Sequence, residues 1–204
     1  MFVLTFDQRR STGAPDRVPE AVAALSAVAA PSQERSALVL PIERTVGDEA
    51  QALLDDASTT VALVLELARH GGWSIGLGIG GVRTPLGAST RASTGDAYVR
   101  AREAVERAKS RGPSVPLAVE GPDPDAAREV EALLRLLAVV VGRRTARGWE
   151  AVDGLLEHGG RQTDVARALG ISEQAVSQRL RTGLWAEETA ARPVVERLLT
   201  EADR

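Results

Sequence analysis

The chain has 204 residues, enough for one solid core with a small satellite domain, and a net charge of −3 that excludes general binding to polyanions. It has no cysteine and only two histidines, which excludes disulfides, thiolate chemistry and a histidine-rich metal site. The longest apolar run, 132–141, is interrupted by Arg135 and is far shorter than the roughly 20 residues that span a bilayer. No signal peptide is recognisable, so we expect a cytoplasmic protein without membrane association.

Apolar strand-like segments and helix-forming segments alternate over the first 120 residues. The pattern predicts strands at 2–6, 37–42, 73–82 and 115–119 and helices at 19–30, 57–70 and 95–111. The segment 49–54 fits either a further strand or a run into the next helix, and Pro41 predicts an edge or bent strand. Strands and helices mixed at this spacing predict an α+β domain of ferredoxin-like type.

Glycines alternate with apolar residues in the segment WSIGLGIGGV at 73–82. Gly76, Gly78 and Gly80 fall on one face of the predicted strand. A face without side chains lets either a packed helix or a ligand approach the backbone closely. The sequence leaves these two alternatives open.

The sequence GPDP at 121–124 breaks the pattern, and everything after it is predicted to be helical. We expect helices at 125–147, 149–158, 162–169, 172–181 and 187–202, the last one kinked at Pro193 or beginning there. The predicted organisation is therefore an α+β domain at 1–121, a connecting helix at 122–147 and a helical domain at 148–204.

The segment QTDVARALGISEQAVSQRLR at 162–181 has the pattern of a helix-turn-helix. Val165, Ala166 and Leu169 form the inner face of a first helix, and Val176 and Leu180 anchor a second one. Between them, Gly170 permits a left-handed turn, Ile171 fills the space between the helices and Ser172 is suited to cap the second helix.

The outward side chains of the second helix include glutamine and arginine, which make bidentate contacts with adenine and guanine in the major groove. We therefore expect double-stranded DNA as a partner; a hairpin used only for packing is the alternative. The predicted DNA-binding residues are Ser172, Glu173, Gln174, Ser177, Gln178, Arg181, Arg161 and Arg179. Further arginines expected to hold phosphates are Arg143, Arg144, Arg147 and Arg167.

One helix-turn-helix rarely binds DNA tightly by itself, so we expect a homodimer that reads two half-sites. The helix predicted at 125–147 carries a wide apolar stripe that is either core or a dimer seam. The residues of this stripe are Leu133, Leu134, Leu137, Val140 and Val141.

Two carboxylates are the candidate metal ligands of the N-terminal domain. Asp7 follows the first predicted strand, and Asp48 lies in the turn after the second one. In a ferredoxin-like sheet the two face each other, and two oxygen ligands suit Mg²⁺ or Mn²⁺ with a nucleotide phosphate completing the shell. Taken singly, Asp7 is more typical of a solvated carboxylate in a loop, and Asp48 of a residue in a tight turn.

In order and spacing, these motifs resemble the SatD family of bacterial proteins. The resemblance is carried by LTFDQRRS at 4–11, GDEAQALL at 47–54, WSIGLGIGGV at 73–82 and STGDAYVRAREAVERAK at 93–109. The N-terminal part looks like the nucleotide-cyclase superfold of class III adenylyl cyclases and GGDEF diguanylate cyclases, which implies a metal and nucleotide site at Asp7 and Asp48. The segment 162–181 is similar to the helix-turn-helix of sigma-factor region 4.

Departures from these families argue against turnover. Ala50 stands where a phenylalanine usually follows GDE, Val46-Gly47 replaces a double glycine, and GDAYVRARE at 95–103 lacks the asparagine of class III cyclases. We therefore expect a DNA-binding transcriptional regulator whose N-terminal domain senses a ligand or dimerises. The alternatives are a metal-dependent nucleotide-binding or cyclase-like enzyme that uses Asp7 and Asp48, and an interaction scaffold that binds neither DNA nor nucleotide.

Overall fold

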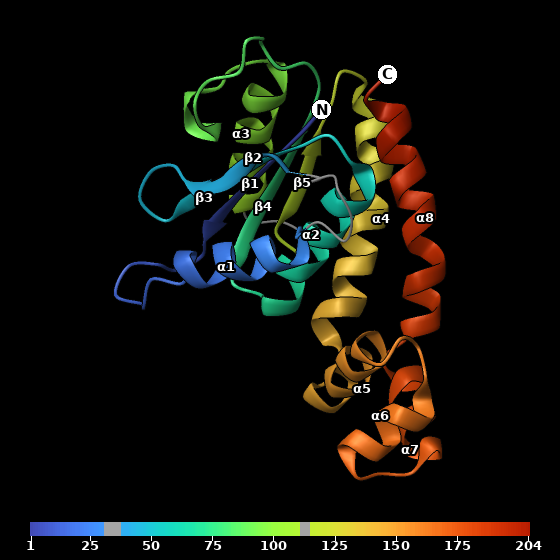
Figure 1. The fold of residues 1–204 in the computed structure, drawn as a ribbon. Helices are drawn as coiled ribbons and strands as arrows, with labels where there is room; N and C mark the ends of the chain where they lie inside the picture. The colour runs from blue at the N-terminus through green and yellow to red at the C-terminus, as the bar shows by residue number, and fades with distance from the viewer. Residues whose placement is uncertain (31–37, 111–114) are drawn as a thin grey trace.

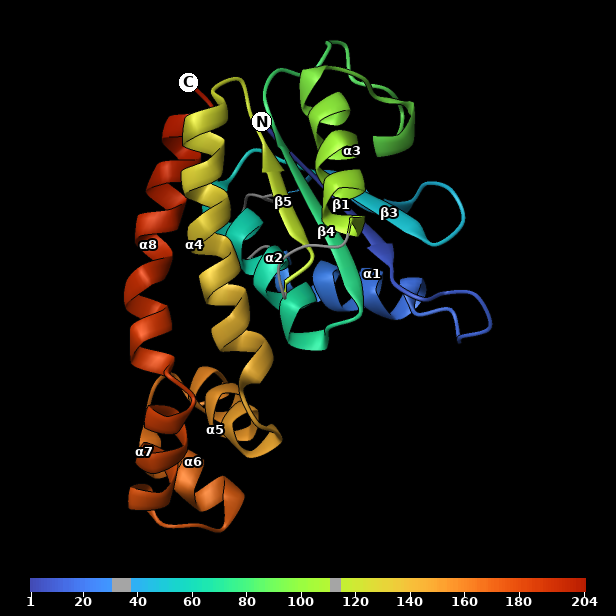
Figure 2. The same cartoon turned by 180° about the vertical axis from the view of Figure 1, so that it is seen from behind.

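The computed structural model describes residues 1–30, 38–110 and 115–204. Within these ranges the chain is an α+β protein with a five-stranded mixed sheet and eight α-helices. Helices cover both faces of the sheet, and two long helices extend beyond it to a small helical cluster (Figure 1). Seen from behind, helix α3 (Asp96–Lys109) lies across the opposite face of the sheet (Figure 2).

The strand order is β2-β3-β1-β4-β5, antiparallel throughout except for the parallel pair β4 and β5. The strands are β1 (Phe2–Gln8), β2 (Leu38–Arg44), β3 (Glu49–Leu54), β4 (Trp73–Ile79) and β5 (Leu117–Glu120). The segment 49–54 is therefore a strand, and β2 is an edge strand with register shifts around Pro41. An edge position suits Pro41 because proline has no N–H to donate to a neighbouring strand.

The helices are α1 (Val18–Val28), α2 (Ala57–His70), α3 (Asp96–Lys109), α4 (Pro124–Arg143), α5 (Ala146–Glu157), α6 (Gln162–Leu169), α7 (Glu173–Thr182) and α8 (Trp185–Ala202). Several boundaries differ from expectation. Strand β1 continues to Gln8, so Asp7 lies inside the strand and does not follow it. Strand β4 ends at Ile79, and α4 ends at Arg143 because Thr145 caps a new helix, α5. Pro193 lies inside α8 and does not begin it. Ala37 and Arg111, the ends of a predicted strand and a predicted helix, lie outside the described residues.

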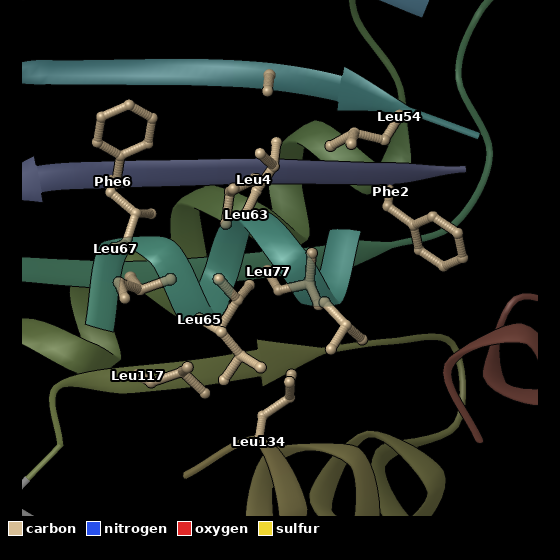
Figure 3. Close-up of a cluster of buried hydrophobic side chains, with 14 of the residues drawn as sticks. Phe2, Leu4, Phe6, Leu54, Leu63, Leu65, Leu67, Leu77, Leu117 and Leu134 are labelled. Carbon is tan, nitrogen blue, oxygen red and sulfur yellow. The ribbon is translucent and has the colours of Figure 1, made fainter. Parts of the chain in front are cut away.

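The main core lies between the sheet and the helices α1, α2, α4 and α8. Alternate residues Phe2, Leu4 and Phe6 of β1 point to this face, where Leu63 and Leu67 of α2 meet them (Figure 3). Burying such side chains is the main stabilising contribution to the fold, about 1.5–3 kcal/mol for each large apolar group.

Helix α3 packs on the other face of the sheet, directly over the glycines of β4. A Cβ atom at Gly78 would lie 2.1 Å from the carbonyl oxygen of Ala97, and one at Gly76 would lie 2.3 Å from the backbone nitrogen of Val105. Of the two alternatives for this face, the packed helix is therefore the one that the structure shows.

Helix α8 runs back along α4 toward the sheet (Figures 1 and 2). Its residues Val195, Leu199 and Ala202 belong to the main core, and the amino group of Met1 is paired with Asp203. The range 148–204 thus contributes both to the small cluster and to the main core. None of the helices in the described ranges is both long and apolar enough to cross a membrane.

Candidate functional site

Helices α5, α6 and α7 form a compact unit beyond the ends of α4 and α8 (Figure 1). The unit has a core of its own, separate from the main one. Its buried members are Ala151, Val152, Leu155, Val165, Ala166, Val176 and Leu180. The inner-face residues expected from the sequence therefore meet as predicted, with α5 as the supporting third helix.

The turn between α6 and α7 has the local geometry that the sequence predicts. Gly170 is left-handed, with φ 65° and ψ 32°, and the N–H of Ile171 donates to the carbonyl of Ala166 at 3.0 Å. The Oγ atom of Ser172 accepts the N–H of Ala175 at 3.1 Å and so caps α7. Glycine is required because a side chain resists this backbone conformation, and the cap fixes where α7 begins.

Most of the residues expected to contact DNA bases lie on the exposed side of α7. Ser172, Glu173, Gln174, Gln178 and Arg181 are exposed and Ser177 is half-buried. Gln178 donates to the hydroxyl of Thr182 at 3.4 Å and accepts from Arg181 at 3.5 Å. Within the described residues, the Gln174 side chain has no hydrogen-bond partner. The outer face of α7 therefore offers amide and guanidinium groups for an external partner.

The flanking arginines divide into paired and unpaired ones. Arg161 and Arg167 share the carboxylate of Asp164, and Arg179, whose side chain is only 22% exposed, binds Glu150 at 2.9 Å. The side chain of Arg144 is fully buried, so the expectation that it holds a phosphate is wrong. Arg143 and Arg147 are exposed and have no ion-pair partner within the described residues.

Two arginines connect this unit to the rest of the molecule. The buried Arg144 binds Glu188 of α8 at 2.5 Å and the carbonyl of Gly183 at 2.8 and 2.9 Å. Arg69 of α2 makes a two-bonded pair with Asp153 of α5, at 2.8 and 2.6 Å, and lies 3.9 Å from the ring centroid of Trp149. The sequence analysis did not identify these contacts.

The expected carboxylates, Asp7 and Asp48, line one open cleft of about 320 Å³ at the end of the sheet. Asp7 lies opposite Glu49 in the β1–β3 register, and the N–H of Gln8 donates to the carbonyl of Asp48 at 3.2 Å. Lys109 at the end of α3 also lines the cleft, with its Nζ atom 3.0 Å from Asp7. The sequence analysis missed Lys109, although it is the single lysine of the chain.

Burial raises the pKa of Asp7, and the negative charges of Asp48 and Glu49 add to this effect, whereas Lys109 opposes it. An ammonium group therefore supplies the positive charge next to Asp7. No three His, Cys, Asp or Glu side chains of the described residues are placed to hold a metal ion. A divalent cation at this cleft would therefore have Asp7 and Asp48 as its carboxylate ligands, and water or a phosphate would have to supply the others.

Replacing Asp7 by asparagine is expected to stabilise the protein at neutral pH. A carboxyl group whose folded pKa is raised costs stability when ionised, and the cost disappears as the pH falls through that pKa toward the ordinary value of about 4. Urea unfolding at pH 7 and at pH 4 checks this, because the gain should shrink at the lower pH. Asp16→Asn is the opposite control, since the hydrogen bond from Arg44 lowers the pKa of Asp16. A loss of stability in Asp7→Asn at pH 7 contradicts the prediction.

No protein-family model, no curated protein sequence and no solved structure matches the chain.

Proposed function

We propose that the protein is a DNA-binding transcriptional regulator that reads the major groove with α7. The observation that carries this proposal is the exposed polar face of α7, which projects from a helical unit with its own core, a left-handed glycine turn and a serine cap. Such a capped helix presents its first residues to base edges. Gln174 is exposed near the start of α7 and its side chain has no partner among the described residues, and we propose that it contacts an adenine.

Two finer features belong to the same proposal. The antiparallel order β2-β3-β1-β4 supports a ferredoxin-like sheet extended by β5, and the order of the sequence motifs supports membership of the SatD family. Most of the apolar stripe of α4 is not available as a dimer seam, so the proposed homodimer must use another face. Leu134, Leu137 and Val141 of that stripe are buried in the main core.

The nucleotide-handling alternative receives less support. Asp7 and Asp48 share a cleft, but Asp7 is already paired with the ammonium group of Lys109, and Ala50 and the segment 95–103 depart from the cyclase motifs. The N-terminal domain is therefore proposed as a sensing or dimerisation domain without turnover.

Selection of bound fragments from a genomic DNA library tests the proposal. The wild type should enrich fragments that share a sequence, and Gln174→Ala should weaken binding to the enriched sequence by roughly 5- to 150-fold, because a bidentate base contact contributes about 1–3 kcal/mol. Arg197→Ala, which removes an exposed arginine of α8, is the matched control and should bind as the wild type does. No enrichment by the wild type, or equal binding by Gln174→Ala, contradicts the assignment of α7.

A further inference from the structure

A depression of about 280 Å³ lies between the α4–α5 turn and the C-terminal half of α7. Side chains from both elements line it. They include Arg143, Thr145, Arg147, Gln178 and Thr182. It is separate from the cleft at Asp7 and Asp48, which is lined by other residues.

Uncompensated positive charge gathers at this depression. Arg143 and Arg147 are exposed, and neither forms an ion pair with another described residue. Arg179 and the buried Arg144 also line it, but Arg179 is paired with Glu150 and Arg144 with Glu188. Two unpaired guanidinium groups next to an amide and two hydroxyl groups form a set of donors suited to a phosphate.

The depression adjoins the face of α7 that we propose reads DNA, because Gln178 belongs to both. In a helix-turn-helix complex the first residues of the second helix meet the bases, while neighbouring parts of the protein meet the backbone that borders the groove. Gln178 lies in the second half of α7, four residues after Gln174, which places it closer to the bordering backbone.

We propose that this depression binds a phosphate group, and that the phosphate is one of the DNA backbone beside the groove occupied by α7. The inference rests on the proposed function. It assigns Arg143 and Arg147 to binding without sequence preference, and Gln178 to the phosphate in place of a base.

The test compares the wild type with Arg147→Gln on an enriched DNA fragment and on a scrambled one, in 50–200 mM salt. The variant should bind both fragments more weakly by the same factor. Each lost phosphate contact makes the log–log salt dependence shallower by about 0.9, so the wild type should lose roughly 3.5-fold more affinity than the variant across this range. Arg147→Lys keeps the charge and should retain the salt dependence, and Arg128→Gln, at an exposed site on α4, is the matched control.

The outcomes separate this inference from the proposed function. If Arg147→Gln matches the wild type while Gln174→Ala still fails on the enriched fragment, the phosphate site is wrong and DNA reading by α7 stands. If Arg147→Gln binds only the enriched fragment more weakly, Arg147 contacts a base, and this result also overturns the phosphate site. If the wild type binds no DNA, inorganic phosphate is titrated against chloride at equal ionic strength. A rise in melting temperature that Arg147→Gln abolishes supports the site with free phosphate as its ligand, and no rise overturns it.

Discussion

Replacing Gly78 by alanine should destabilise the protein by about 3 kcal/mol or more, because overpacking typically costs 1–3 kcal/mol and here the obstacle is backbone. The new Cβ atom would lie 2.1 Å from the carbonyl oxygen of Ala97 and 2.3 Å from the backbone nitrogen of Ala101. Both are backbone atoms of a helix, so neither can move out of the way by a change of rotamer. Helix α3 would have to move away from β4 and lose its packing on the sheet.

Urea unfolding at neutral pH measures this effect, with Gly81→Ala as the matched control. A Cβ atom at Gly81 meets nothing within 4 Å, so the control should change the free energy of unfolding by no more than about 0.5–1 kcal/mol. An alanine at position 78 that leaves stability unchanged would show that α3 does not pack on the glycine face of β4 this closely.

Replacing Glu188 by alanine should cost about 3–5 kcal/mol of folding stability, because it leaves the charge of Arg144 buried without its carboxylate. Both side chains of this pair are fully buried. Only the carbonyl of Gly183 would remain to accept hydrogen bonds from the Arg144 guanidinium. The cost comes from the unpaired charge and not from the carboxylate itself.

A double variant distinguishes these causes. Glu188→Leu combined with Arg144→Met removes both buried charges and fills similar volume. Arg192 also loses its carboxylate, but its side chain is 30% exposed and can reach water, so the double variant should recover most of the stability that Glu188→Ala loses. Thermal and urea unfolding of the three proteins measure the difference. If the double variant is as unstable as Glu188→Ala, the loss reflects packing at the α4–α8 junction, and the buried charge is not its cause.

The local parts of the fold could be predicted from the sequence. The α6–α7 turn depends on residues within a few positions of one another: a glycine for the left-handed backbone, a serine for the cap and apolar residues at helical spacing. A short apolar run likewise predicts strand β1. These features are encoded by backbone preference and periodicity, which a single segment carries by itself.

The organisation of long-range contacts could not be predicted in this way. The sequence analysis divided the chain at 121 and 147, but α8 returns from the far end and buries Val195 and Leu199 in the main core, against α2 and α4. The glycines of β4 allowed a helix or a ligand, and only the placement of α3 decided between them. Such packing depends on which apolar faces meet, and each face alone is compatible with several partners.

At both candidate sites, the sequence and the tertiary structure each determined a different part of the chemistry. By itself, the sequence determined which groups are present: the polar outer face of α7, the arginines around it, and Asp7 with Asp48. The tertiary structure decided which of their charges are free, by pairing Asp7 with Lys109 and Arg144 with Glu188, 44 positions away, while leaving Arg143 and Arg147 unpaired within the described residues. The physical reason is that an ion pair depends on the distance and burial of two side chains, which are fixed only when distant segments pack together.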